Sequence, residues 1–206
     1  MRIGIDFDNT IVCYDALFHR LAVTRGLIDA HTPATKSAVR DALCRRGRED
    51  LWTALQGEAY GQRIDEADEY PGVRRFIARC RRAGHRVFII SHKTRRPCAG
   101  PDGDLHAAAR TWLRGRGIVG PQLDAVIAAD VFFELTLAEK LRRIGDAGCT
   151  WFIDDLPQCL REPAFPPGVE KLLFDPHDHD AGASGLRCAR SWDVLSRLIL
   201  DGELVS

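Results

Sequence analysis

Residues 1–10, MRIGIDFDNT, decide how the rest of this chain is interpreted. Apolar side chains alternate from Ile3 to Phe7, which predicts a buried strand that begins almost at the N-terminus. Asp6 and Asp8 then stand where this strand leaves the sheet, because aspartate favours turns over strands. In an open α/β sheet, ligands bind at the carboxyl ends of the strands. The stretch therefore predicts a core strand whose tip carries a functional site.

The two carboxylates at this tip need a positive partner. Like charges close together repel each other, and burial raises the free energy of the charged forms. A hard divalent cation such as Mg²⁺ is one candidate partner, since it prefers carboxylate oxygens. The alternative is an ordinary turn rich in aspartate and asparagine, and Asp-x-Asp by itself does not separate the two interpretations.

The composition is that of an ordinary globular protein. Of the 206 residues, 45% are hydrophobic and 28% are charged, and 29 basic residues balance 29 acidic ones. This balance gives no sign of a nucleic-acid partner or of an anionic membrane surface. No apolar run approaches the length of a membrane span, and the N-terminal strand lacks the pattern of a signal peptide.

Seven cysteines are scattered along the chain, and none forms a Cys-x-x-Cys pair. An odd, dispersed set in a chain of this length is typical of free thiols in a reducing compartment, so we expect a cytoplasmic protein. The missing pair spacing also argues against a zinc site.

Strands and helices alternate after the first strand. Apolar stretches predict four more strands, at residues 85–91, 123–129, 149–153 and 170–174. Helical spacing predicts helices after the break at Pro71, at residues 105–113 and 135–144, in a short piece from Pro157, and at residues 192–200. Because strands alternate with helices, we expect an α/β fold, a doubly wound parallel sheet with helices on both faces.

A helical insertion interrupts this core. From Tyr14 to Tyr70 the spacing of apolar residues predicts three helices, and no convincing strand is found there. The Tyr-Pro-Gly sequence at residues 70–72 marks its end. We therefore expect two domains, a core of residues 1–13 and 71–206 and a small helical domain of residues 14–70 inserted after the first strand.

Polar side chains also follow two later strands. Ser91 ends the second strand, and Asp154 and Asp155 end the fourth. Lys140 precedes this acidic pair. Because the carboxyl ends of parallel strands open on one edge of the sheet, these groups can converge with Asp6 although they are far apart in the sequence.

This ordered set resembles the four motifs of the haloacid dehalogenase-like hydrolase superfamily. The first motif, Asp-x-Asp-x-Thr after a strand, is matched by residues 6–10, and the second, Ser or Thr after an apolar strand, by Ser91. The third, a lysine, is best matched by Lys140, and the fourth, an acidic pair, by Asp154 and Asp155. The resemblance covers nearly the whole chain. It implies a Rossmann-like core, and the insertion then looks like a type-1 helical cap that closes over the site.

The resemblance also implies a role for each motif residue. Asp6 would attack phosphorus and form an aspartyl-phosphate. Asp8 would protonate the leaving oxygen and later take a proton from water, so it must start protonated. Lys140 and a Mg²⁺ ion would neutralise the phosphoryl oxygens, and Ser91 would donate a hydrogen bond to them.

The implied Mg²⁺ ligands are the carboxylate of Asp6, the main-chain carbonyl of Asp8 and a carboxylate of the acidic pair. We prefer Asp154 as that ligand, with Asp155 either ligating or supporting the site through hydrogen bonds. Three further residues complete the predicted phosphate-binding set: Thr10, His92 and Lys93. Lys93 follows Ser91 closely and competes with Lys140 for the phosphate; we favour Lys140 because it precedes the fourth motif.

Two other groups of residues allow a functional and a structural interpretation. The aromatic residues Phe18, Trp52 and Tyr60 of the insertion would line a substrate pocket or form the core of the cap, and we favour the core. Residues 177–180, His-Asp-His-Asp, suggest a second metal site, but a turn after a strand explains them better.

Together these observations predict a Mg²⁺-dependent phosphomonoesterase that acts on a small phosphorylated metabolite. A phosphotransferase, a mutase or a dehalogenase of the same superfamily is the alternative. A phospho-acceptor signalling module and a non-catalytic binding protein remain as alternatives of other classes. The sequence names neither the substrate nor the oligomeric state.

Overall fold

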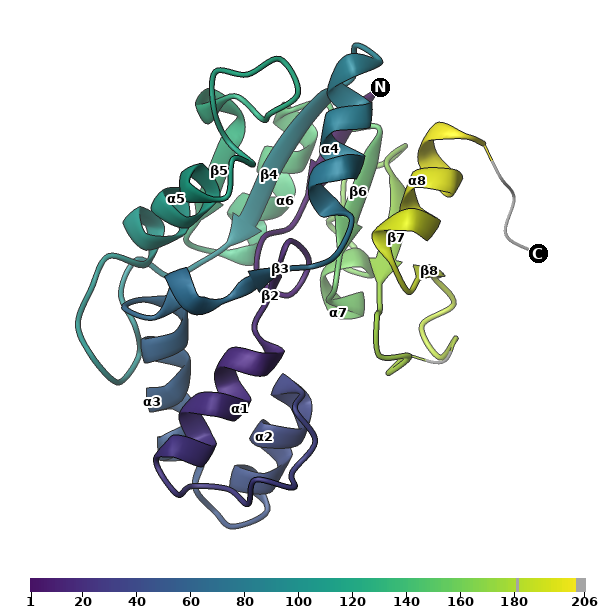
Figure 1. Ribbon diagram of the computed structural model, residues 1–206. Helices are drawn as coiled ribbons and strands as arrows, with labels where there is room; N and C mark the ends of the chain where they lie inside the picture. The colour runs from purple at the N-terminus through teal and green to yellow at the C-terminus, as the bar shows by residue number, and fades with distance from the viewer. Residues whose placement is uncertain (181, 203–206) are drawn as a thin grey trace. The chain divides into compact units, whose positions relative to one another are not determined.

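The computed structural model describes residues 1–180 and 182–202, and the chain divides into two compact units (Figure 1). Unit 1 comprises Met1–Ile11, Glu69–Lys93 and the described residues from Arg116 onward. Unit 2 comprises Val12–Asp68 and Thr94–Gly115. The chain therefore leaves unit 1 twice, once directly after the acidic turn and once directly after Lys93.

Unit 1 contains a six-stranded sheet in which every neighbouring pair is parallel. The strand order is β5-β4-β1-β6-β7-β8, so β1 lies in the interior between β4 and β6 (Figure 1). The strands are β1 (Arg2–Ile5), β4 (Arg86–His92), β5 (Val131–Glu134), β6 (Trp151–Asp154), β7 (Glu170–Phe174) and β8 (Arg187–Ala189). The prediction of a doubly wound parallel α/β sheet is confirmed.

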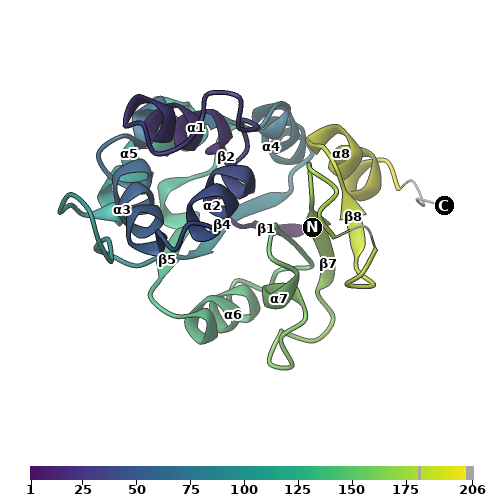
Figure 2. The same cartoon turned by 90° about the horizontal axis from the view of Figure 1, so that it is seen from below.

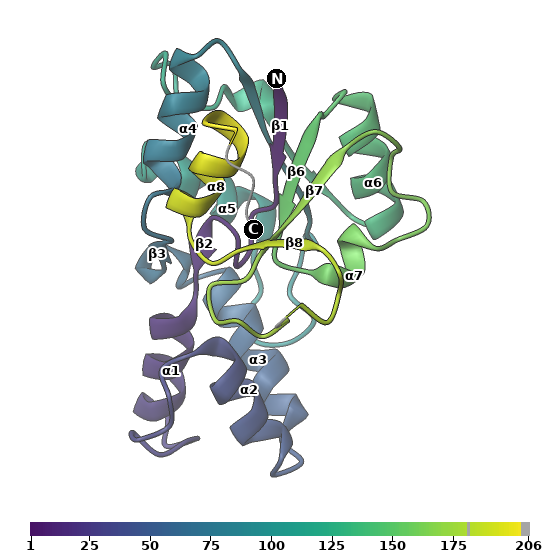
Figure 3. The same ribbon diagram turned by 90° about the vertical axis from the view of Figure 1, so that its right-hand side faces the viewer.

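Helices cover both faces of this sheet. Helices α4 (Val73–Arg82) and α8 (Trp192–Leu200) lie on one face, and α6 (Leu137–Asp146) and α7 (Pro157–Leu160) lie on the other (Figures 2 and 3). Coverage on both sides explains why the central strands are apolar throughout. Ile5 is fully buried and pairs in register with Ile89 on β4 and Ile153 on β6.

Unit 2 is mainly helical. It contains α1 (Asp15–Thr24), α2 (Lys36–Cys44), α3 (Glu49–Tyr60), the short 3₁₀ helix η1 (Ile64–Glu66) and α5 (Leu105–Gly115). The expectation of no strand between residues 14 and 70 is wrong at one place, since β3 (Asp68–Glu69) pairs with β2 (Val12–Cys13). Two-residue strands carry no alternation that a sequence pattern could reveal.

The segment Thr94–Gly115, which the sequence analysis grouped with the core, clusters with the helices of unit 2. Glycine makes this approach feasible: a Cβ atom added at Gly57 on α3 would lie 1.9 Å from the carbonyl oxygen of Ala99. The indole N–H of Trp112 on α5 also donates to the carbonyl of Ala67 over 3.0 Å. The division into a core and an inserted cap of residues 14–70 stays a proposal.

The third strand lies further along the chain than expected. Residues 123–129 were predicted to form it, but Leu123 is 76% exposed and Val126 makes only an isolated bridge to Val119. The strand is β5 (Val131–Glu134), preceded by the 3₁₀ helix η2 (Ala128–Asp130). Both stretches are apolar, and only pairing with β4 decides between them. Among the described residues, no helix has the length and apolar character that crossing a membrane requires.

Candidate active site

The acidic turn leaves β1 at the carboxyl edge of the sheet. Asp6 continues the pairing with β6, since its N–H donates to the carbonyl of Ile153 over 2.9 Å. The N–H of Ile11 then donates to the carbonyl of Phe7 over 3.0 Å and closes the turn. Asn9 has a φ of 59°, a left-handed conformation that asparagine tolerates better than most residues. The turn therefore leaves two carboxylates at the tip of a central strand.

Lys140 joins two carboxylates from neighbouring strands. Its Nζ lies 2.6 Å from Oδ1 of Asp6 and 2.6 Å from Oδ2 of Asp154, and all three side chains are buried. Helix α6 places the lysine one turn after its start, where Thr136 and Glu139 form a reciprocal capping box. The structure thus brings together three residues that the sequence analysis placed in one site.

Burial dominates the electrostatics of this trio. Burial raises the pKa of Asp6 to about 7, and the charge of Asp154 adds to this effect while the ammonium of Lys140 opposes it. Burial by itself lowers the pKa of Lys140, but the charges of Asp6 and Asp154 outweigh it and raise that pKa well above its ordinary value. One buried ammonium therefore compensates two buried carboxylates only in part.

Lys93 contacts Asp8. Its Nζ lies 3.0 and 2.8 Å from the two carboxylate oxygens of Asp8 and 5.4 Å from the ring centre of Phe7. The backbone N–H of Lys93 donates to the carbonyl of Glu134 on β5, which continues the sheet past the end of β4. Lys93 is only 4% exposed, whereas the side chain of Asp8 is 18% exposed, so the ammonium of this ion pair is buried and its carboxylate is partly exposed.

The other predicted phosphate-binding residues occupy different surroundings. Ser91 is buried in β4, two positions beyond the residue that pairs with Ile5. His92 is exposed, and its Nε2 lies 3.1 Å from the carbonyl oxygen of Leu135. Thr10 is fully buried, and its hydroxyl donates to Oδ1 of Asp155 over 3.3 Å. Thr10 therefore contacts the acidic pair.

Three carboxylates form a cluster that fits a cation. Asp6, Asp154 and Asp155 each offer an oxygen, and these oxygens lie within 4.8 Å of one another. Of these three side chains, Asp6 and Asp154 contact the ammonium of Lys140, and Asp155 accepts from the hydroxyl of Thr10. An all-oxygen donor set of this kind suits a hard divalent ion such as Mg²⁺.

Sequence reasoning missed two residues near this cluster. Cys159 on α7 is buried and hydrogen-bonds to the carboxylate of Asp154, and burial raises the pKa of its thiol. Trp192 on α8 donates its indole N–H to the carbonyl of Thr10 over 3.2 Å. Cys159 follows the acidic pair by less than two helical turns, a spacing that could have drawn attention to it. No local pattern connects Trp192 with Thr10.

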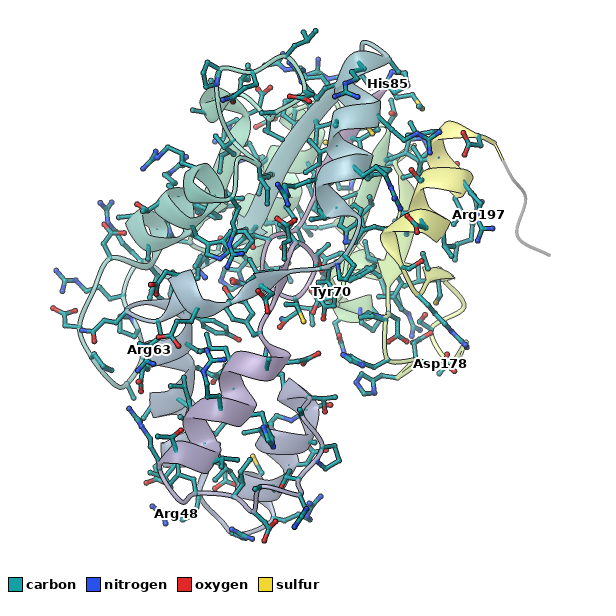
Figure 4. All side chains as sticks on the ribbon, in the orientation of Figure 1. Arg48, Arg63, Tyr70, His85, Asp178 and Arg197 are labelled. Atoms are coloured by element: carbon teal, nitrogen blue, oxygen red, sulfur yellow. The ribbon has the colours of Figure 1, made fainter. Side chains whose placement is uncertain are left out.

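The histidine and aspartate residues at 177–180 belong to a hydrogen-bonded loop after β7. The carboxylate of Asp175 accepts from the backbone N–H groups of His179 and Asp180. The carboxylate of Asp180 in turn accepts from the hydroxyl of Ser184 over 2.7 Å. Asp178, labelled in Figure 4, has a φ of 58° and forms an ion pair with Arg190. These bonds give the acidic side chains of the loop a structural role.

The aromatic residues of unit 2 form its core. The rings of Phe18 and Trp52 lie 4.8 Å apart, and both side chains are buried. Tyr60 packs against Tyr14 at 4.8 Å, and Nζ of Lys36 lies 5.4 Å from the ring centre of Tyr60. This agrees with the structural interpretation that the sequence analysis preferred.

No protein-family model matches the chain, and no curated protein does. Solved structures do match it over nearly their full lengths. A HAD-superfamily hydrolase from Ehrlichia chaffeensis shares 12% identity at a TM-score of 0.60, covering 97% of this chain and 96% of that one. A predicted phosphoglycolate phosphatase from Haemophilus somnus shares 13% identity at a TM-score of 0.54, covering 95% and 96%. A dehalogenase with an intermediate complex shares 14% identity at a TM-score of 0.55, covering 96% of each chain. At these identities the likeness establishes the fold alone.

Proposed function

Starting from the fold that this chain has in common with the haloacid dehalogenase-like hydrolases, we propose that it is a Mg²⁺-dependent phosphomonoesterase. The observation that carries the proposal is the placement of Lys140 between Asp6 and Asp154 at the carboxyl edge of the sheet. The substrate class that suits this charge arrangement is a small phosphorylated metabolite. Its phosphoryl oxygens would meet an ammonium group and a cation at one point.

Asp6 is the proposed nucleophile. A carboxylate that attacks phosphorus splits one displacement into two easier steps through an aspartyl-phosphate. Asp6 must be ionised to attack, and the ammonium of Lys140 at 2.6 Å favours that form against the effect of burial. Lys140 would then neutralise charge on the transferred group, while Ser91 is the proposed hydrogen-bond donor from β4.

Asp8 is the proposed general acid and base. It would protonate the leaving oxygen and later take a proton from the water that hydrolyses the aspartyl-phosphate. The ion pair with Lys93 fixes the position of its carboxylate, and Asp8 must take up a proton before it acts as the acid. We therefore propose that Lys93 is the ion-pair partner of Asp8 and that Lys140 is the lysine that faces the phosphoryl group.

The proposed Mg²⁺ ligands are the carboxylates of Asp6 and of Asp154 or Asp155, with the main-chain carbonyl of Asp8. When bound, the ion would add positive charge where the phosphoryl oxygens sit. One oxygen of Asp154 accepts a hydrogen bond from the ammonium of Lys140, and the other accepts from the backbone N–H of Leu156. Asp155 is held by Thr10. Both arrangements support a preformed ligand set.

A dehalogenase is the second candidate, because one of the similar structures is a dehalogenase. Dehalogenases of this superfamily need no metal, so the cluster of Asp6, Asp154 and Asp155 favours the phosphatase. All seven cysteines are free, which suits a reducing compartment, and we propose a cytoplasmic location.

Hydrolysis of p-nitrophenyl phosphate with and without Mg²⁺ tests the proposal, together with chloride release from a 2-chloro acid. We expect phosphate release that disappears in EDTA and returns with Mg²⁺, no chloride release, and no activity in Asp6→Asn. Chloride release in EDTA would favour the dehalogenase instead. Inactivity of the wild-type chain toward a broad panel of phosphate esters would contradict the enzyme assignment.

A further inference from the structure

We propose that Trp192 is a positioning residue that holds the acidic turn, through Thr10, against the acidic pair at the end of β6. The effect of Trp192 on Mg²⁺ affinity rests on the function proposed above, whereas its effect on the conformation of the acidic turn does not. Trp192 lies 182 residues after Thr10, on the last helix of the chain, and touches none of the proposed reacting atoms.

A two-bond relay connects the residues. The indole N–H of Trp192 donates to the carbonyl of Thr10 over 3.2 Å, and the hydroxyl of Thr10 donates to Oδ1 of Asp155 over 3.3 Å. Trp192 is 1% exposed and Thr10 is 0% exposed. Water therefore does not replace the indole as donor, and a buried carbonyl without a donor is destabilising.

The indole is fixed from several sides. Its ring centre lies 5.1 Å from that of Phe76 on α4 and 5.6 Å from that of Phe174 on β7. A Cβ atom added at Gly72 would lie 3.1 Å from Cβ of Trp192, so the start of α4 packs closely against it. The hydroxyl of Ser191 accepts from the N–H of Val194 and caps α8. A ring held in this way is a rigid donor.

The turn that it holds depends on such support. Asn9 adopts the left-handed conformation, which persists where surrounding contacts hold it. Tyr70, labelled in Figure 4, donates its backbone N–H to the carbonyl of Ile11 over 2.9 Å, and its ring packs 4.9 Å from that of Phe174. The aromatic block of Tyr70, Phe76, Phe174 and Trp192 thus holds the carbonyls of Thr10 and Ile11, at the point where the chain leaves unit 1.

The test replaces Trp192 by phenylalanine, which keeps an aromatic ring and removes the N–H. A second variant carries benzothienylalanine at position 192, which keeps the shape of indole but has sulfur in place of N–H. The matched control is Trp112→Phe, because Trp112 is also buried and also donates its indole N–H to a backbone carbonyl, that of Ala67 in unit 2. Replacement by phenylalanine therefore removes an indole-to-carbonyl hydrogen bond at either position.

The first readout is hydrogen exchange at the amide of Ile11, which bonds to Phe7 within the turn, in the absence of metal. The second is the Kd for Mg²⁺ by titration calorimetry. Loss of one buried hydrogen bond corresponds to about a threefold to tenfold change in an equilibrium constant. We expect faster exchange at Ile11 and a Kd raised by about that factor in both variants at position 192, with neither change in Trp112→Phe.

Unchanged exchange at Ile11 in the benzothienylalanine variant would overturn the proposal, and so would equal effects in Trp112→Phe. If the wild-type chain binds no Mg²⁺, the proposed function fails, whereas the exchange measurement still decides whether Trp192 holds the turn. A double-variant cycle with Thr10→Val adds a check on the relay. Additive effects of Thr10→Val and Trp192→Phe on exchange would contradict a shared path.

Discussion

The ammonium group of Lys93 binds both carboxylate oxygens of Asp8, at 3.0 and 2.8 Å. The ammonium is buried next to the ring of Phe7, at the point where β4 ends and the chain passes to unit 2. A buried ammonium that contacts both oxygens fixes the orientation of a carboxylate as well as balancing its charge. Lys93 therefore orients the carboxylate of Asp8, the residue that we propose as general acid and base.

We expect Lys93→Met to impair catalysis in a way that depends on the leaving group. An alkyl phosphate needs its leaving oxygen protonated by Asp8, whereas p-nitrophenolate leaves without much help. A misplaced Asp8 should lower kcat for glycerol phosphate by about 10–100-fold, part of the usual contribution of acid–base catalysis, and lower it much less for p-nitrophenyl phosphate. Steady-state kinetics on both esters measures this.

Lys171→Met is the matched control for this substitution. Lys171 lies on β7, and its ammonium lies 4.4 Å from the ring centre of Phe165. Lys171→Met therefore removes a cation–π contact, as Lys93→Met does. We expect wild-type kcat for both esters in this control. Equal losses on the two esters in Lys93→Met would mean that Lys93 acts on the phosphoryl group and not through Asp8.

Lys140→Met should destabilise the fold as well as abolish turnover. The substitution leaves the carboxylates of Asp6 and Asp154 buried without their shared partner. Breaking a buried ion pair in this way lowers the free energy of unfolding by about 3–5 kcal/mol. Denaturant unfolding at pH 8 measures the loss, again with Lys171→Met as the control.

Mg²⁺ should restore part of the stability lost in Lys140→Met, because a cation bound only by the folded state stabilises it by mass action. The same ion should restore little in a variant that also carries Asp154→Asn. A Lys140→Met chain as stable as the wild type, with no response to Mg²⁺, would contradict the electrostatic account of the trio.

The cysteines should differ sharply in reactivity. Burial raises the pKa of the Cys80 and Cys149 thiols to about 12, while Cys98 is exposed. At pH 8 the thiolate fraction of a group with a pKa near 12 is on the order of 10⁻⁴, so iodoacetamide should modify Cys98 first. Mass spectrometry of the native protein follows the sites, and Cys98→Ser should remove the fast phase. Rapid labelling of Cys149 in the folded chain would refute this.

The same raised pKa values fix the direction of a pH effect on stability. Cys80 and Cys149 stay protonated in the folded state at pH values where unfolded thiols have ionised. The contribution of these two thiols to the free energy of unfolding is therefore fully present below about pH 8.5, the ordinary thiol pKa, and is lost as the pH rises toward 12. Unfolding measured from pH 8 to 11 should show a decline that is shallower in Cys80→Ala.

Much of the site could be predicted from the sequence because strand direction determines where strand ends lie. Once β1, β4 and β6 are parallel neighbours, Asp6, Ser91 and Asp154 must share one edge of the sheet. Lys140 joins them because α6 leads directly into β6. The partner of Lys93 could not be predicted, since its side-chain direction depends on how the chain continues past the end of β4.

Long-range packing explains the other misses. Leu123 and Val131 stand in equally apolar surroundings in the sequence, and only pairing with β4 selects the second stretch. The loop that precedes α5 approaches α3 closely at Gly57, whose missing side chain admits the backbone of Ala99. Neither contact leaves a local pattern, because both join residues far apart in the chain.

Asp6 and Asp8 stand in one turn, but the proposed mechanism gives them different tasks. Asp6→Asn removes the nucleophile, so we expect no covalent intermediate and no turnover. Asp8→Asn keeps the nucleophile and the main-chain carbonyl and removes the acid and base, which is worth roughly 10²–10⁴-fold. Phosphorylation of this variant should survive better with p-nitrophenyl phosphate than with an alkyl phosphate.

Hydrolysis of the aspartyl-phosphate should also slow in Asp8→Asn, because water has lost its base, so the intermediate should accumulate. Asp8→Asn also leaves the ammonium of Lys93 without its carboxylate, and the double variant with Lys93→Met separates that charge effect from the loss of the acid. Rapid-quench kinetics with both esters and trapping of the acyl-phosphate provide the measurement. If Asp6→Asn still forms a covalent phosphoprotein, or Asp8→Asn slows both esters equally without accumulation, these two roles are wrongly assigned.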